Sequence, residues 1–127
     1  MFRLAAIVLL ALAAPLAAQG LKWENTTASL DLEPGGGKTS GEFRFTNTSD
    51  HTVTIRSVPA SCGCVASKPE KLEYAPGENG IIPFTYTPKK KWGTFAYRLY
   101  VVTDEKGIKP YPLVVEVTER RPAPTRQ

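Results

Sequence analysis

The sequence has 127 residues, which leaves room for one folded domain and not for two. It carries 16 Lys and Arg against 12 Asp and Glu, a formal net charge of +4, and this small basic excess does not indicate a nucleic-acid-binding protein. The only two cysteines are separated by one residue, which excludes the dense cystine framework of small secreted scaffolds. The fold must therefore depend mainly on a hydrophobic core.

The first 18 residues have the layout of a secretory signal peptide. Arg3 precedes an unbroken apolar run over residues 4–14, and Pro15, Leu16, Ala17 and Ala18 follow. This stretch is shorter than the roughly 20 residues of a transmembrane helix, so cleavage after Ala18 is favoured over a retained anchor. No cysteine lies near the cleavage site, which disfavours a bacterial lipoprotein. The pattern predicts a periplasmic or extracellular mature chain that begins near Gln19 and has no membrane span.

The rest of the chain has the pattern of β-strands. Apolar and polar residues alternate at period two, which places the apolar side chains on one face of a sheet. The alternation covers residues 43–45, 53–55, 82–86, 95–101 and 113–117, and Trp23 and residues 28–32 add two segments at the start. Turns rich in Gly, Pro and Asn separate them. About seven strands predict an all-β, immunoglobulin-like β-sandwich over residues 19–119, with a small barrel as the alternative and a disordered tail over 120–127.

Four motifs suggest a family. They are Phe43-Arg44-Phe45-Thr46-Asn47-Thr48, Ser61-Cys62-Gly63-Cys64, Ala75-Pro76-Gly77-Glu78 and Gly93-Thr94-Phe95. In this order and spacing the chain resembles, from about residue 21 to 118, the bacterial exported proteins grouped as domain of unknown function 1573. The resemblance implies an immunoglobulin-like sandwich similar to ASH and major sperm protein modules, and no established activity. Ser49 replaces a usual glycine and Val65 a usual threonine, which leaves open the turn type and the need for a hydroxyl beside the cysteines.

The Cys62-Gly63-Cys64 segment is the main candidate for chemistry. In an extended strand, residues two apart lie about 6.6 Å from each other, near the upper limit for a disulfide. Gly63 would permit the sharper backbone that closing such a ring demands. A bond across three residues would stabilise the fold by only about 1.6 kcal/mol before strain is subtracted. The spacing therefore favours a labile, redox-active pair over a structural staple.

Two other interpretations of Cys62 and Cys64 stay open. Soft thiolates favour Cu(I) or Zn(II), so both cysteines are candidate metal ligands. A structural zinc site needs four ligands, and the lone His51 precedes a strand that puts it about 20 Å from Cys62, too far also for a catalytic dyad. Two-coordinate Cu(I), or a four-thiolate site shared by a dimer, would be compatible with the sequence. The third interpretation is inert packing of two small side chains at a strand end.

One further segment is a candidate contact site. Lys89, Lys90, Lys91 and Trp92 occupy a predicted loop tip, where they could contact anionic lipid head groups or acidic polysaccharide. The favoured alternative is a solvated loop with Trp92 folded back onto the core. No phosphate loop, carboxylate pair or Ser-His-Asp set is evident, so we expect a non-catalytic module for an unknown envelope or extracellular partner protein. The alternative function is a thiol-redox or copper-binding protein.

Overall fold

The computed structural model describes residues 20–122 of the chain. The predicted signal peptide, its cleavage site after Ala18 and residues 123–127 of the predicted tail lie outside this part. The described residues form nine strands. Among them there is no helix of the length and apolar character that crossing a membrane requires.

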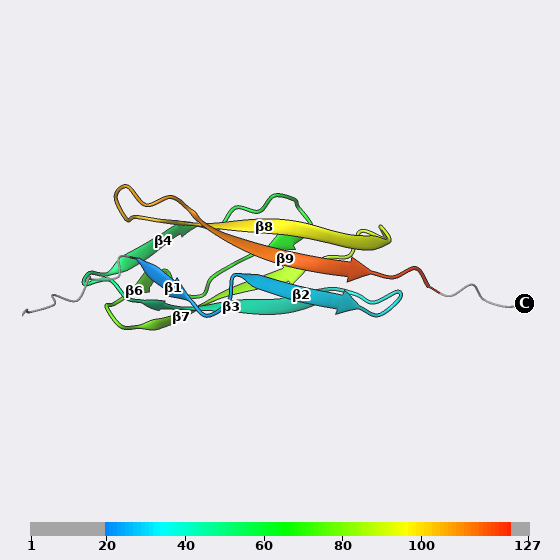
Figure 1. The fold of residues 1–127 in the computed structure, drawn as a ribbon, viewed down its shortest axis with the longest axis horizontal. Coiled ribbons are helices and arrows are strands. Elements are labelled where there is room, and N and C mark those ends of the chain that lie inside the picture. Colours follow the sequence, from blue (N-terminus) through cyan, green and yellow to red (C-terminus); the bar gives the residue numbers. More distant parts are fainter. Residues whose placement is uncertain (1–19, 123–127) are drawn as a thin grey trace, which may run out of the picture.

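The nine strands form two stacked sheets. They are β1 (Leu21–Trp23), β2 (Thr27–Leu32), β3 (Thr39–Asn47), β4 (Val53–Ser57), β5 (Val65–Ala66), β6 (Glu73–Tyr74), β7 (Asn79–Tyr86), β8 (Gly93–Thr103) and β9 (Tyr111–Glu119). One sheet has the order β1-β3-β7-β5 and the other the order β2-β9-β8-β4-β6. Figure 1 shows them as two layers, with β8 and β9 above β3 and β7. The prediction of an all-β sandwich is confirmed.

The strand count differs from the expected seven because two strands are very short. β5 and β6 have two residues each, which is too few for an alternating pattern to be recognised. The two segments expected at the start are both strands, but they belong to different sheets. β1 pairs antiparallel with β3, whereas β2 pairs parallel with β9. The described chain thus begins in one sheet and crosses to the other.

Aromatic side chains fill the space between the sheets. Phe43 and Phe45 of β3 and Phe84 of β7 are buried, as the alternation predicts. The ring centroids of Phe43 and Phe84 lie 5.2 Å apart, and those of Phe45 and Tyr74 4.8 Å apart. Such pairs add about 0.5–1.5 kcal/mol each beyond the apolar area that they bury. The opposite sheet contributes aliphatic side chains, which include Leu99, Val101, Leu113, Val115 and Val117.

The turn after β3 is built around a buried amide. The Asn47 side chain donates to the carbonyls of His51 and Tyr74, both at 2.9 Å. Its own Oδ1 accepts the Ser49 amide at 3.0 Å and lies 2.6 Å from the Ser49 hydroxyl. Every polar group of this buried side chain is therefore satisfied. Ser49 stands where the family usually has glycine. Its hydroxyl takes part in this network, which a glycine could not do.

Gly80 gives a test of the aromatic packing. It lies opposite Phe45 in the sheet, and a Cβ added there would overlap the rings of Phe45 and Tyr74. We expect Gly80→Ala to lower the free energy of unfolding by about 1–3 kcal/mol, because buried rings must shift to make room. Urea denaturation measures the loss. Gly37→Ala is the control, since a Cβ there meets nothing within 4 Å; equal stability of the two variants would contradict the packing described.

Candidate functional site

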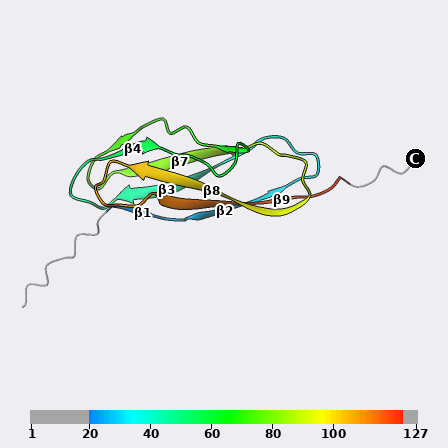
Figure 2. The same ribbon diagram turned by 90° about the horizontal axis from the view of Figure 1, so that it is seen from above.

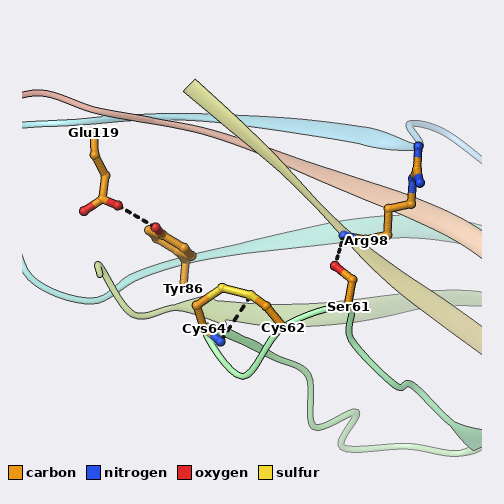
Figure 3. The surroundings of a disulfide bond; sticks show 6 residues. All are labelled: Ser61, Cys62, Cys64, Tyr86, Arg98 and Glu119. Atoms are coloured by element: carbon orange, nitrogen blue, oxygen red, sulfur yellow. Dashed lines mark hydrogen bonds between the residues drawn. A yellow bond between two sulfur atoms is a disulfide. The ribbon is translucent and has the colours of Figure 1, made fainter. Parts of the chain in front are cut away.

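The chain reaches the cysteine segment along an edge of β8. β4 pairs with β8, and residues 59–61 continue along the same side. The amide of Tyr100 donates to the Pro59 carbonyl at 2.9 Å. The Ser61 amide donates to the Arg98 carbonyl at 2.8 Å, and the Ser61 hydroxyl accepts the Arg98 amide at 2.9 Å (Figure 3). Ser61 therefore marks the end of pairing on this side of β8.

Cys62, Gly63 and Cys64 then carry the chain from one sheet to the other. They form a turn, and β5 follows it directly. β5 pairs with the end of β7, where Val65 lies opposite Tyr86. The Thr87 amide donates to the Cys64 carbonyl at 2.8 Å, which extends this pairing by one bond. The cysteine segment is thus the crossover between β8 of the five-stranded sheet and β7 of the four-stranded sheet.

The two cysteines are joined by a disulfide bond (Figure 3). Their Cα atoms lie 5.4 Å apart, within the usual range for disulfides. The expectation of extended strand geometry is corrected here, because a turn brings the residues closer than a strand would. Gly63 does not need a left-handed backbone for this turn. Cys64 is buried, at 3% exposed, and its amide points at the half-buried Cys62 Sγ from 3.3 Å.

The structure does not bring His51 to the cysteines. His51 is exposed in the turn before β4, where its Nδ1 lies 3.1 Å from Asp50 Oδ1. Cys62 follows the far end of the same strand segment. Within residues 20–122 there is no group of three His, Cys, Asp or Glu side chains that could hold a metal ion. Cu(I) binding by Cys62 and Cys64 stays a prediction, and it applies to the reduced thiols.

A buried hydrogen bond beside the disulfide was not foreseen from the sequence. The Tyr86 hydroxyl donates to Glu119 Oε2 at 2.7 Å (Figure 3), and Glu119 is 5% exposed. The Tyr86 ring stacks on Tyr97, with ring centroids 5.6 Å apart. Burial, helped by the bond to Glu119, raises the pKa of Tyr86 well above its usual value near 10. The bond links the ends of β7 and β9, which lie in different sheets.

A cavity of about 590 Å³ opens at the same end of the sandwich. Its lining comes from the loop between β2 and β3, the loop between β7 and β8, and the end of β9: Leu32, Glu33, Gly35, Gly36, Gly37, Lys38, Thr87, Pro88, Lys90, Trp92, Glu119, Arg120 and Pro122. Of the predicted contact residues, Lys90 and Trp92 line the cavity, whereas Lys89 and Lys91 are exposed outside that lining. Trp92 is 38% exposed and is not among the side chains that pack against the core.

Comparison with known families agrees with the motifs. A family model described as "Protein of unknown function (DUF1573)" matches residues 21–118. The chain belongs to this family. No curated protein matches the sequence.

Solved structures confirm the fold of this DUF1573 domain. A protein of unknown function from Porphyromonas gingivalis W83 matches 85% of the chain with a TM-score of 0.68 and 16% identity. The ASH/PapD-like domain 7 of human CEP192 matches 96% of the chain and 100% of that domain, with a TM-score of 0.61 and 9% identity. The CupB2 chaperone of Pseudomonas aeruginosa matches 77% of the chain and 55% of that protein, with a TM-score of 0.57 and 11% identity. At these identities the likeness shows the fold alone. The chain spans about half, 51%, of the Porphyromonas protein.

Removing the disulfide should weaken the domain without unfolding it. The double variant Cys62→Ala, Cys64→Ala should lose about 1.6 kcal/mol of unfolding free energy or less, because the bond closes a loop of only three residues. Guanidinium denaturation with far-UV circular dichroism measures the loss. The oxidised and reduced wild-type chains are the matched pair for comparison. An unfolded double variant would contradict a core that stands without the bond.

Alkaline pH should reveal the buried tyrosines. The pKa of Tyr86 is raised, and burial, helped by the bond to Glu105, raises the pKa of Tyr111 to about 12. Above about pH 10 the unfolded chain loses the phenolic protons of these tyrosines before the folded chain does. The free energy of unfolding should therefore fall, by up to about 1.4 kcal/mol per pH unit for each tyrosine. Urea denaturation at stepped pH should give a flatter profile for Tyr86→Phe than for Tyr100→Phe. Identical profiles would contradict the buried donor role of Tyr86.

Proposed function

We propose that this chain is an exported, non-catalytic interaction module of the cell envelope. The proposal is that it pairs with an extended segment of a partner protein along the open edge of β8. The predicted signal peptide supports export, and the chain shares its fold with a bacterial chaperone and with an ASH domain. One observation carries the proposal. Between Gly93 and Tyr97, β8 has no paired strand on the side that faces away from β9.

β9 pairs with one side of β8 from Gly93 to Val101. On the other side, β4 and residues 59–61 pair with β8 only as far as Arg98. Figure 2 shows β4 and β9 on opposite sides of β8. Among the described strands, none pairs with residues 93–97 on the β4 side.

The backbone groups at this open edge point away from β9. Backbone groups of successive residues in a strand face opposite sides, and those of Arg98 and Tyr100 face residues 59–61. The amides and carbonyls of Thr94 and Ala96 must therefore face the open side. Both residues are exposed. An added strand could bond to both.

On the same side of the sandwich, β7 also extends beyond its neighbour β5, which pairs only with Thr85 and Tyr86. This free part of β7 differs from the open edge of β8. Pro83 has no amide to donate, and its carbonyl already accepts the Ser67 hydroxyl at 2.5 Å. Proline on an edge strand is a device that prevents strand addition. Residues 93–97 of β8 contain no proline and no charged side chain. This difference supports the β8 edge as the binding edge.

Charge indicates the chemistry of the partner. Residues 89–91 supply three lysines directly before the open edge, and Arg98 follows it with an exposed side chain. An extended segment that bears Asp or Glu would combine backbone bonds with attraction to these cations. The proposed partner is therefore an acidic, extended segment of an envelope or extracellular protein.

The thiol-redox alternative has less support. An attacking thiolate would bond to the half-buried Cys62 sulfur and release Cys64 as a thiolate. Cys64 is only 3% exposed, and burial disfavours the charged thiolate that must leave. The role stays a prediction, as does copper binding by the reduced pair.

Site-specific photocrosslinking in the native cell tests the binding edge. A photoreactive residue at Thr94 should crosslink to a discrete partner, whereas one at Glu116 should not. Glu116 is exposed on β9 and lies opposite Ala96, away from the open edge. The Thr94 crosslink should disappear in Ala96→Pro, which loses the edge amide, and persist in Ala96→Val.

Circular dichroism and thermal melting check that Ala96→Pro is folded. Should that variant unfold, the variant Lys89→Glu, Lys91→Glu takes its place and should weaken the crosslink by repulsion of the acidic segment. Crosslinks of equal strength from Thr94 and Glu116, or a Thr94 crosslink that survives these changes in folded protein, would contradict the proposal.

A further inference from the structure

We propose that the end cavity is a binding site for an acidic saccharide. This site lies beside the β8 edge, shares Lys90 with the charged segment before that edge, and does not depend on the function proposed above. The cavity of about 590 Å³ has the size of a small-ligand site. Its lining combines an aromatic side chain, a glycine-rich backbone segment, a buried carboxylate and cations. Each of these can recognise a different part of such a ligand.

The apolar part of the lining fits a sugar ring. Leu32 forms a buried wall, and Pro88 and Pro122 also line the cavity. Trp92 also lines the cavity and is 38% exposed, so part of its aromatic side chain is accessible there. The C–H face of a pyranose can pack on such a ring while its hydroxyls stay free to hydrogen-bond.

The polar part of the lining fits the hydroxyls. Glu119 is 5% exposed, and its Oε2 accepts the Tyr86 hydroxyl. A buried carboxylate gains from further donors, and sugar hydroxyls are donors. Gly35 and Gly37 are exposed and leave open space where a side chain would stand, so a ligand can approach the backbone closely there.

The cations give the preference for an acidic ligand. Three cations, Lys38, Lys90 and Arg120, line the cavity against two carboxylates, those of Glu33 and Glu119. Arg120 is already paired with Asp31 at 2.8 Å. Within residues 20–122 neither Lys38 nor Lys90 forms an ion pair, so both can bind a ligand carboxylate. Lys90 has a φ of 58°, a left-handed conformation that costs a non-glycine residue energy. Such outliers cluster at ligand sites.

Titration of the full, disulfide-intact chain tests the site. The probes are hexagalacturonate and a hyaluronate hexasaccharide, with neutral maltohexaose as the comparison. Isothermal titration and tryptophan fluorescence should give saturable binding of an acidic probe with a Kd below about 1 mM. Salt should weaken the binding, because the attraction to Lys38 and Lys90 is screened.

Matched variants locate the binding. Trp92→Ala and the double change Lys38→Ser, Lys90→Ser should each weaken it by about tenfold or more, an effect of about 1.4 kcal/mol. Ile81→Ala and Lys106→Ser are the controls and should leave it unchanged. The exposed fraction of Ile81, 41%, is similar to the 38% of Trp92, and neither control residue lines the cavity. Glu119→Gln retains an acceptor for Tyr86 and should weaken binding less than Trp92→Ala.

The site would be overturned if neither acidic probe showed saturable binding, if maltohexaose bound equally well, or if Trp92→Ala left the binding unchanged. Binding only to vesicles of anionic phospholipid would also overturn it, in favour of a membrane contact. The Thr94 crosslink should persist in Trp92→Ala, so failure of the saccharide site and failure of the strand-pairing function are distinguishable.

Discussion

The crossover at Cys62, Gly63 and Cys64 is the constraint on which the rest of the structure depends. The layers of a β-sandwich lie about 10 Å apart, and this short segment must take the chain from β8 in one layer to β7 in the other. The pairing of residues 59–61 with β8 therefore stops at Arg98, and the pairing of β5 with β7 starts at Tyr86. The disulfide holds the turn at the point where both changes occur.

The same crossover explains why the two proposed binding features lie close together. By ending the pairing at Arg98 it leaves residues 93–97 of β8 without a neighbour on one side. Through the bond from the Thr87 amide to the Cys64 carbonyl it also anchors the start of the loop that carries Lys90 and Trp92. That loop lines the cavity and leads directly into the open edge at Gly93. The course of the chain through the crossover thus leaves one side of β8 unpaired and fixes the loop beside it.

Local pattern was sufficient to predict the sandwich but not the site. Alternation such as Phe43, Phe45 and Leu113, Val115, Val117 identified the inward faces, because burial imposes that period directly. It failed for β5 and β6, which are too short to have a period, and for the cysteine segment, where a turn replaces the expected strand. Export and cleavage after Ala18 stay predictions, since those residues lie outside the described part.

The site depends on contacts between residues distant in the sequence. Glu119 continues the inward alternation of β9, so its burial could have been predicted from the sequence. Its hydrogen-bond partner Tyr86 lies 33 residues away and could not. The cavity brings Leu32, Trp92 and Arg120 together from three parts of the chain. No spacing rule predicts such a meeting, because it is set by where the strands end relative to one another.

Amide hydrogen exchange of the disulfide-intact chain, measured residue by residue by NMR, tests the open edge most directly. We predict rapid exchange at Thr94 and Ala96, whose amides face the open side, and slow exchange at Phe95 and Tyr97, whose amides face β9. Slow exchange at all four amides would show that the edge is covered and would contradict an open edge on β8.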